Sequence, residues 1–174
     1  MGIQFETDYN METLTAMAKS LRKTVRRKRS RRVHIFAAVV LILGLLTILA
    51  TVAGGEPLGA SGVVTLLAML MVILVSLFED RLNAWFAKKR LLPGTEHAVA
   101  TFEEDGYVSA TSMSESKFSY AQIVAVAETE RYFVFALSSH HTQAYDKRTI
   151  RGGSVEDFRA FIAEKTGKPI ANIK

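Results

Sequence analysis

The sequence predicts a membrane α + β protein, in which a two-helix transmembrane hairpin precedes a bent antiparallel sheet closed by a C-terminal helix. Glu56 is the only Asp, Glu, Lys or Arg between residues 33 and 78, whereas the other 38 of the 39 charged side chains lie outside this block. From residue 97 onward the apolar residues recur first with period two and then with a helical period. A single soluble globular domain mixes apolar and charged residues, so that class is excluded.

Residues 33–53 and 59–78 are predicted to form transmembrane helices 1 and 2. The first run has 21 residues without a full charge, and a helix of that length spans about 31 Å, the thickness of a bilayer core. Residues 54–58, with the sequence GGEPL, are predicted to be a short external loop. Neither run has a polar face, which argues against two core helices of a soluble protein. Neither carries a carboxylate, Lys or Arg at membrane depth, which argues against an ion-coupled transporter.

The flanking charges predict the orientation of the hairpin. Nine Lys and Arg residues precede the first run, four follow the second within residues 81–90, and the loop has none. Cations remain on the cytoplasmic side, so both termini are expected in the cytoplasm and residues 79–96 form a cytoplasmic connector. Ser30-Arg31-Arg32 resembles the start of a twin-arginine signal, but the first run is too long for a signal core and a second run follows it.

Residues 1–32 are predicted to be an N-terminal strand followed by a basic helical arm. Ile3 and Phe5 alternate with polar residues, which indicates a strand over 2–7, and a helix is expected to begin near Asn10. No Pro or Gly occurs from Met11 to Leu43, so we expect one continuous helix from the arm through the first span. An apolar stripe along it comprises Leu14, Met17, Leu21 and Val25.

A run of cations at the end of the arm is expected to lie at the lipid headgroups. Each such cation gains about 1 kcal/mol near an anionic membrane surface. Nucleic-acid binding is disfavoured, because the run has no interleaved aromatic residues and adjoins a membrane span. This membrane-surface basic run consists of Arg26, Arg27, Lys28, Arg29, Arg31 and Arg32.

Residues 97–174 are predicted to form the β domain. Ala98, Ala100 and Phe102 share one face of a strand, and Glu104-Asp105-Gly106 is a hairpin signal. A second strand is expected at 107–111, Phe118 and Tyr120 open a third segment, and further strands are expected at 123–127, 132–137 and 143–146. Residues 114–117 are expected to be a polar turn. A helix is predicted from Ser154, with Asp157 completing a capping box. This helix, with Phe158 and Phe161, is expected to plug the open end of the sheet, which is the element order of pleckstrin-homology domains.

The stretch from Thr101 to Gly167 resembles the YcxB-like family of bacterial membrane proteins. The predicted transmembrane hairpin and the preceding strand-and-helix arm also fit, so the resemblance covers nearly the whole chain. The residues that carry the resemblance are Glu104-Asp105-Gly106, the step from Tyr120 to Ile123, the turn from Glu128 to Tyr132-Phe133, and Lys147-Arg148 before Ser154–Phe158. Tyr145-Asp146 stands where the family often has an isoleucine-proline pair. The resemblance implies a pleckstrin-homology-like C-terminal domain and a location in the bacterial cytoplasmic (inner) membrane, and it implies no established activity.

The sequence contains one candidate ligand-binding patch and no recognised catalytic motif. Neither a Gly-rich phosphate loop nor an HExxH, GxSxG or acidic metal repeat occurs, and there is no cysteine. His140 and His141 are adjacent in a strand end and point to opposite sides, which suits joint chelation poorly. We therefore expect no catalytic residues, no metal site and no cofactor. Lys147, Arg148 and Arg151 cluster and would suit an anionic headgroup, although a solvated loop is the simpler interpretation.

The sequence favours a non-enzymatic membrane protein that presents a cytoplasmic interaction or scaffold domain. The alternatives are an anionic-lipid-sensing module and a subunit of a small oligomeric channel, export or immunity component. We expect contacts with membrane lipids, no nucleic acid, an unidentified protein partner as an open possibility, and a homo-oligomer, most simply a twofold dimer. The dimer is expected to be held by the membrane helices and the arm. The apolar stripe of the arm offers one contact, and its strand, with Ile3 and Phe5, could pair with an open edge of its own or a neighbour's β domain. Both spans also carry small residues that permit close helix packing, namely Ala37, Ala38, Gly44, Ala60, Ser61, Thr65, Ala68 and Ser76.

Overall fold

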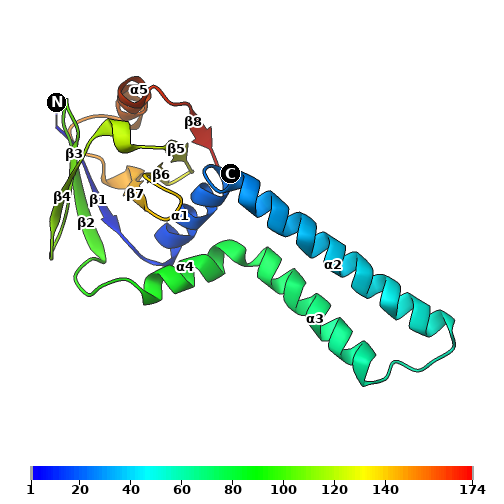
Figure 1. The fold of residues 1–174 in the computed structure, drawn as a ribbon. Coiled ribbons are helices and arrows are strands. Elements are labelled where there is room, and N and C mark those ends of the chain that lie inside the picture. Colours follow the sequence, from blue (N-terminus) through cyan, green and yellow to red (C-terminus); the bar gives the residue numbers. More distant parts are fainter. Residues whose placement is uncertain (1, 174) are drawn as a thin grey trace.

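The computed structural model describes residues 2–173, in which two long helices project from a domain of two β-sheets (Figure 1). In the first sheet the strand order is β1-β2-β3-β4, and in the second it is β7-β6-β5-β8. All neighbouring strands are antiparallel except β8, which runs parallel to β5. The strands are β1 (Ile3–Asp8), β2 (His97–Phe102), β3 (Tyr107–Thr111), β4 (Glu115–Phe118), β5 (Ala125–Glu128), β6 (Tyr132–Ala136), β7 (Thr142–Asp146) and β8 (Ile170–Asn172).

The N-terminal strand belongs to the β domain. β1 pairs with β2 along its whole length, in a register that runs from Ile3 opposite Phe102 to Asp8 opposite His97. Ile3, Phe5 and Thr7 are buried, as the alternation of the sequence predicts for one face of a strand. The expected arm of residues 1–32 is therefore divided in the structure, because its strand completes the sheet of the domain predicted for residues 97–174.

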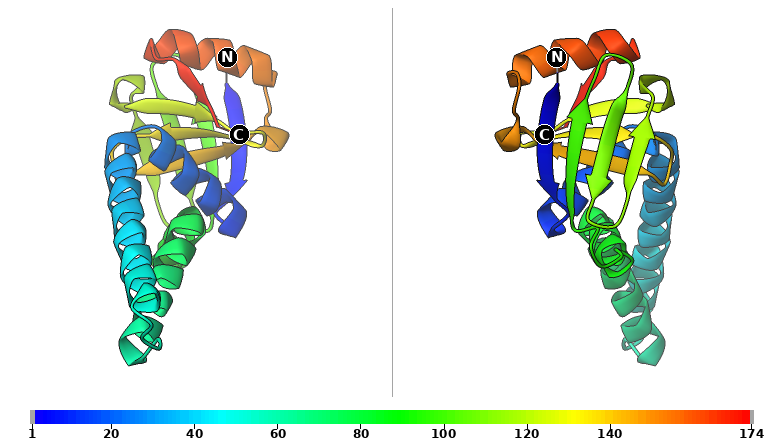
Figure 2. Two further views of the ribbon diagram at one scale, coloured as in Figure 1. Left: turned by 90° about the vertical axis from the view of Figure 1, so that its right-hand side faces the viewer. Right: turned by 90° about the vertical axis from the view of Figure 1, so that its left-hand side faces the viewer.

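The helix α5 (Val155–Thr166) closes the domain at the end opposite the projecting helices (Figure 2). Its N-cap is the predicted one: Ser154 Oγ accepts from the Asp157 N–H, and an Asp157 carboxylate oxygen accepts from the Ser154 N–H, both at 3.0 Å. The helix ends before Gly167, as expected. Ser154–Thr166 is thus confirmed as the C-terminal helical segment of the chain.

An aromatic cluster fills the space between the two sheets and α5. The Phe158 ring is fully buried, and its centroid lies 4.6 Å from that of Phe5, 4.7 Å from that of Phe102 and 5.0 Å from that of Phe133. All three ring contacts are edge-on, the geometry that the aromatic quadrupole favours. The plug predicted from the sequence is confirmed, and β1 supplies one of its central rings.

Four helices separate β1 from β2: α1 (Met11–Lys23), α2 (Arg27–Ala53), α3 (Ala60–Leu77) and α4 (Glu79–Lys89). α2 and α3 are long and apolar enough to cross a membrane, and none of their residues is buried within the chain. They lie side by side as a hairpin (Figures 1 and 2). A Cβ atom at Gly44 would lie 2.7 Å from Met69 Sδ, so this glycine permits the close approach of the two helices.

The predicted continuous helix from the arm into the first span is wrong, because the chain breaks between α1 and α2. The Arg26 N–H donates to the Leu21 carbonyl at 2.9 Å, one residue beyond the α-helical partner, and the Thr24 hydroxyl donates to the Ser20 carbonyl at 2.7 Å. Cations three and four positions apart repel each other on a helix surface, and this segment holds several. A β-branched Thr24-Val25 pair at the same place has low helix propensity.

Two further sequence-based expectations need correction. The polar turn predicted over 114–117 is the strand β4, in which Glu115 pairs opposite Ala110 of β3; its polar composition reflects an exposed edge. The connector predicted over 79–96 contains the helix α4. β8 was not predicted, because its three residues are too few to show a period.

The central position of Phe158 leads to a stability prediction. A soluble variant that joins residue 24 to residue 79 through a short Gly-Ser linker keeps every strand, and the direct contact between Arg22 and Asp80 shows that these ends are close. In this variant Phe158→Ala is expected to lower the free energy of unfolding by about 3–5 kcal/mol, because it leaves a cavity among buried rings. Val124→Ala, at a side chain that is 52% exposed, is the control and should cost under about 0.5 kcal/mol. A loss below about 1 kcal/mol for Phe158→Ala in denaturant unfolding would contradict the plug.

Candidate functional site

The helices α1 and α4 pack together at the junction between the projecting hairpin and the β domain. Ser20 of α1 and Ala84 of α4 are almost fully buried, so small side chains allow the two helices to approach. The Arg22 guanidinium donates two hydrogen bonds of 2.7 Å, one to each carboxylate oxygen of Asp80. These bonds raise the pKa of Arg22 above its ordinary value. The bidentate pair therefore fixes α1 against α4 at the base of the hairpin.

A second carboxylate extends this connection to α2. Glu79 Oε2 lies 3.8 Å from Arg22 Nε and 3.7 Å from His34 Nε2. His34 is on α2, close to the residue where the apolar run begins. The start of α4 thus faces both α1 and α2, and the three helices enclose a space at the junction.

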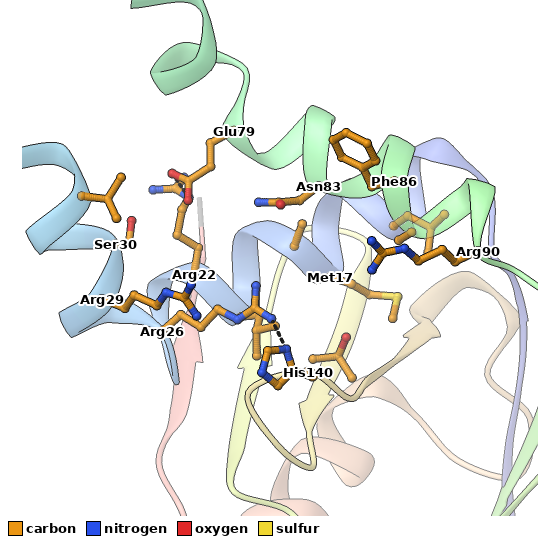
Figure 3. A pocket seen from close by; sticks show the side chains of 16 residues that line it. Met17, Arg22, Arg26, Arg29, Ser30, Glu79, Asn83, Phe86, Arg90 and His140 are labelled. Carbon is orange, nitrogen blue, oxygen red and sulfur yellow. Dashed lines mark hydrogen bonds and ion pairs between the residues drawn. The ribbon is translucent and has the colours of Figure 1, made fainter. Parts of the chain in front are cut away.

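This junction cavity has a volume of about 650 Å³ and lies between α1, the beginning of α2, α4 and the loop that joins β6 to β7 (Figure 3). Apolar side chains contribute part of the lining, among them Leu14, Met17, Leu21, Val33 and Phe86. The charged side chains of the lining come from different elements and are Arg22, Arg26, Arg29, Glu79 and Arg90. The cavity is therefore mixed in character, with four arginines opposed by one glutamate.

The arginines of the junction cavity differ in how they are held. Arg26 Nε donates to the Ser139 carbonyl at 2.6 Å, and its terminal nitrogen lies 3.0 Å from His140 Nδ1 (Figure 3). Because arginine only donates, this Nδ1 is the acceptor. Within residues 2–173, neither Arg29 nor Arg90 makes an ion pair. Two guanidinium groups of the lining thus lack a carboxylate partner in the described part of the chain.

The first turn of α2 adds to the positive potential of the junction cavity. Arg26 is the N-cap residue and provides no side-chain hydrogen bond to the helix, and the first turn contains no acidic residue. The N-terminus of a helix carries a partial positive charge from its unpaired N–H groups, and acidic residues normally offset it. Here the sequence places further cations at that position, an arrangement that an anion would stabilise.

The structure divides the predicted membrane-surface basic run into two groups. Arg26 and Arg29 line the junction cavity. The other four, Arg27, Lys28, Arg31 and Arg32, are exposed and do not line this cavity. The sequence identified the run but not its division, nor the contributions of Arg22, Arg90 and His140, which are brought to the cavity by the packing of α1, α4 and the β6–β7 loop.

The predicted anionic-ligand patch is occupied by carboxylates of the chain itself. Lys147 Nζ lies 3.1 Å from a Glu128 oxygen, Arg148 lies 3.1 Å from an Asp146 oxygen, and Arg151 lies 3.1 Å from a Glu6 oxygen. Each of the three cations thus faces a carboxylate, and the positive charges of Lys147, Arg148 and Arg151 do not sum to an unopposed patch.

Glu128 is the centre of the strongest of these ion pairs. Its side chain is only 9% exposed and accepts hydrogen bonds of 2.8 Å and 2.7 Å from the Arg159 guanidinium of α5. The hydrogen bonds from Arg159, together with that from Lys147, lower the pKa of the Glu128 carboxyl below its ordinary value. This pairing ties β5 to α5 and has a structural role.

The adjacent histidines are not brought together with other ligands. His140 faces Arg26, whereas the His141 ring lies 6.1 Å from the Phe118 ring. In the described range 2–173, no group of three or more His, Cys, Asp or Glu residues is placed to hold a metal ion.

The residues that carry the family resemblance have structural roles around the β2–β3 hairpin. The Tyr120 hydroxyl donates to the carbonyls of Glu103 and Gly106, at 2.6 Å and 2.9 Å, and holds the hairpin closed. A Cβ atom at position 106 would lie 2.5 Å from the Phe118 carbonyl oxygen, so glycine is needed there. Ile123, three residues after Tyr120, is buried in the core.

The pairing of Glu128 predicts a pH-dependent loss of stability. A carboxyl whose folded-state pKa is depressed stabilises the fold fully above its unfolded pKa of about 4.3, and this contribution falls as the pH drops through the folded pKa. At pH 7, Glu128→Gln is expected to reduce the free energy of unfolding of the soluble variant by about 1–3 kcal/mol. Below pH 4 the curves of the variant and the parent should converge.

Denaturant unfolding between pH 3 and 7 measures this difference. Glu130→Gln, two residues away on an exposed turn, removes the same charge and should leave the pH profile unchanged. A constant difference between Glu128→Gln and the parent at every pH would contradict the assignment.

The comparison with known proteins concerns the β domain alone. The family model described as YcxB-like protein matches residues 102–162, from the last residue of β2 into α5. No curated protein and no solved structure matches the chain. The match includes Gly106, Tyr120 and Ile123, whose roles in the hairpin and the core are described above, and it excludes α2 and α3. The resemblance inferred from the sequence is thus confirmed over residues 102–162, which are similar to the YcxB-like family.

Proposed function

We propose that this chain is a non-enzymatic protein of the bacterial cytoplasmic membrane that presents its β domain to the cytoplasm as an interaction or scaffold domain. The observation that carries the proposal is the α1–α4 junction, where the bidentate Arg22–Asp80 pair fixes the domain to the base of an apolar hairpin. Such a junction holds the domain in one orientation relative to the hairpin.

Membrane insertion is supported by the exposed surface of the hairpin. α2 and α3 have no buried residue, and an apolar helix that is exposed on all sides is stable in lipid rather than in water. Trp85 and Phe86 of α4 are 44% and 50% exposed, just beyond the end of α3, and the Lys89 ammonium lies 3.7 Å from the Trp85 ring centroid. Aromatic and basic side chains together are typical of the headgroup region.

The pleckstrin-homology-like assignment is supported by the order of the elements. The first sheet contains β1 to β4 in sequence, the second contains β5 to β7, and α5 follows and covers one end. In this interpretation the membrane hairpin, with α1 and α4, is an insertion between the first and second strands. β8 is an addition at the edge of the second sheet.

The proposed partner surface is the free edge of the first sheet. β4 pairs only with β3 in the described chain, so its outer backbone groups are open to a strand of another protein. Glu115 and Lys117 on this strand are exposed, and charged side chains limit non-specific pairing at such an edge. Strand addition here would favour a partner of matched charge.

The proposed orientation has a direct test. A reporter active only in the cytoplasm should be active when fused at the C-terminus or at the N-terminus, and inactive when inserted at Gly55 in the loop between α2 and α3. The expectation follows from the nine cations before the apolar run that begins at Val33 and the four after α3, against none in the loop. Activity of a periplasmic reporter at the C-terminus would reverse the topology.

Photo-cross-linking in native membranes tests the interaction proposal. A photoreactive amino acid at Lys117 on β4 is expected to yield a cross-link to a second polypeptide, whereas the same group at Glu130, on an exposed turn away from this edge, should not. Absence of any product at Lys117 and at its exposed neighbour Ser116 would count against a scaffold role for this edge.

The mass of the cross-linked product also shows whether the partner is a different protein or a second copy of this chain. The proposed dimer requires a second copy. The apolar stripe Leu14, Met17, Leu21 and the strand β1 pack within their own chain. Any dimer would therefore rest on α2 and α3, and a single-chain mass in nanodiscs across a concentration series would contradict it.

A further inference from the structure

We propose that the junction cavity binds the phosphate of an anionic phospholipid headgroup, an inference that rests on the membrane insertion proposed above. The proposal concerns the space between α1, α2, α4 and the β6–β7 loop, and not the patch at Lys147, Arg148 and Arg151, whose cations face carboxylates of the chain. The arginines that line the cavity would bind a lipid phosphate from the surrounding bilayer.

The position of the cavity at the base of the hairpin favours a lipid headgroup as its ligand. Val33, which begins the apolar run of α2, and Glu79, which begins α4 directly after α3, both line it. These two residues lie at the two places where the chain enters and leaves the hairpin, and Figure 3 shows Glu79 at the edge of the cavity. When α2 and α3 span a bilayer, the cavity lies at the depth of the headgroups on the same side as the β domain. Basic pockets between membrane helices on that side are suited to lipid phosphates.

The positive charge of the arginines that line the cavity favours an anionic ligand. Arg26, Arg29 and Arg90 contribute guanidinium groups, and among residues 2–173 only Arg26 of these three uses its donors, on Ser139 and His140. These two bonds engage two of the five N–H groups of Arg26, so its guanidinium retains further donors. Planar guanidinium groups bind phosphate oxygens with two parallel hydrogen bonds, which an ammonium group does not do.

The lining also accommodates the uncharged part of a lipid. Leu21, Val33 and Phe86 are among the apolar residues of the cavity, and Val33 and Phe86 are 55% and 50% exposed. An acyl chain that leaves the cavity along α2 would pass from Val33 to the apolar surface of the helix. A free phosphate ion would meet the same arginines but would leave this apolar lining in contact with water, so the lipid is the favoured source of the phosphate.

The experiment measures the thermal unfolding of the full chain in a neutral detergent. The probes are dihexanoyl phosphatidylglycerol, dihexanoyl phosphatidylcholine and inorganic phosphate. The wild type is expected to be stabilised saturably by the phosphatidylglycerol, and by the other two only at concentrations about tenfold higher or more, because only the first combines net negative charge with acyl chains.

The test variant is Arg29→Gln/Arg90→Gln, which leaves the bonds of Arg26 intact. Its apparent affinity for dihexanoyl phosphatidylglycerol is expected to fall by about tenfold or more, since each cation near anionic lipid contributes about a fivefold gain. The control is Arg31→Gln/Arg81→Gln, which removes one arginine from each of the same two helices at exposed positions outside the cavity. The control should remain within about threefold of the wild type.

Three results would overturn the proposal. They are an equal loss of affinity in both variants, an equal response to phosphatidylglycerol and phosphatidylcholine, and saturation by inorganic phosphate at the same concentration as by the lipid. The first indicates general surface charge, the second a lack of anion selectivity, and the third a site for a soluble anion. Should the double variant unfold without lipid, Arg29→Gln alone gives the same comparison against Arg31→Gln.

The outcome is separable from that of the proposed function. A failure of lipid selectivity leaves the reporter topology and the cross-links at β4 unchanged, so the scaffold proposal would stand. Conversely, if alkaline carbonate released the chain from membranes, membrane anchoring would fail irrespective of the lipid titration.

Discussion

The pairing of β1 with β2 is the constraint on which the rest of the structure depends. Six residues at the start of the chain lie opposite six that follow the apolar hairpin, in an unbroken antiparallel register. The chain must therefore leave the domain and return to it at neighbouring points. α1 and α4 are the two segments that do so, and their adjacency makes the Arg22–Asp80 pair and the junction cavity possible. Closing so long a loop has an entropic cost that grows only slowly with its length, and the contact of α2 with α3 offsets part of it.

The same pairing determines the composition of the core. Phe5 enters the aromatic cluster from β1 and touches Phe102, Phe133 and Phe158. A chain segment that begins after the hairpin would lack this ring and would expose the edge of β2. The β domain is consequently not the contiguous C-terminal unit that its family match suggests, because its first strand and its remaining strands lie on opposite sides of the apolar helices in the sequence.

Local signals predicted the local elements, and long-range contacts decided the rest. The capping box of Ser154 and Asp157, the hairpin at Gly106 and the alternation in β2 are encoded within a few residues, and the structure confirms them. The break before α2 depends on charge repulsion and on the capture of Arg22 by Asp80, a partner 58 positions away. Of the candidate site, the basic run was visible in the sequence. Its convergence with Arg90 and His140 was not, because that requires α4 and the β6–β7 loop to pack against α1.

The cations of this chain fall into two electrostatic classes that correspond to two different environments. In the β domain, Lys147, Arg148 and Arg159 each lie within 3.1 Å of a carboxylate oxygen, so the domain neutralises its own charges. At the junction, arginines gather around the N-terminus of α2 with no acidic residue in its first turn, an arrangement that costs free energy in water. Such a cluster is compatible with a stable fold when its surroundings supply the negative charge. In the proposed membrane location, a headgroup layer would supply it at the depth at which the apolar surface of α2 begins. That one environment would account for both the exposed apolar hairpin and the arginines at its base.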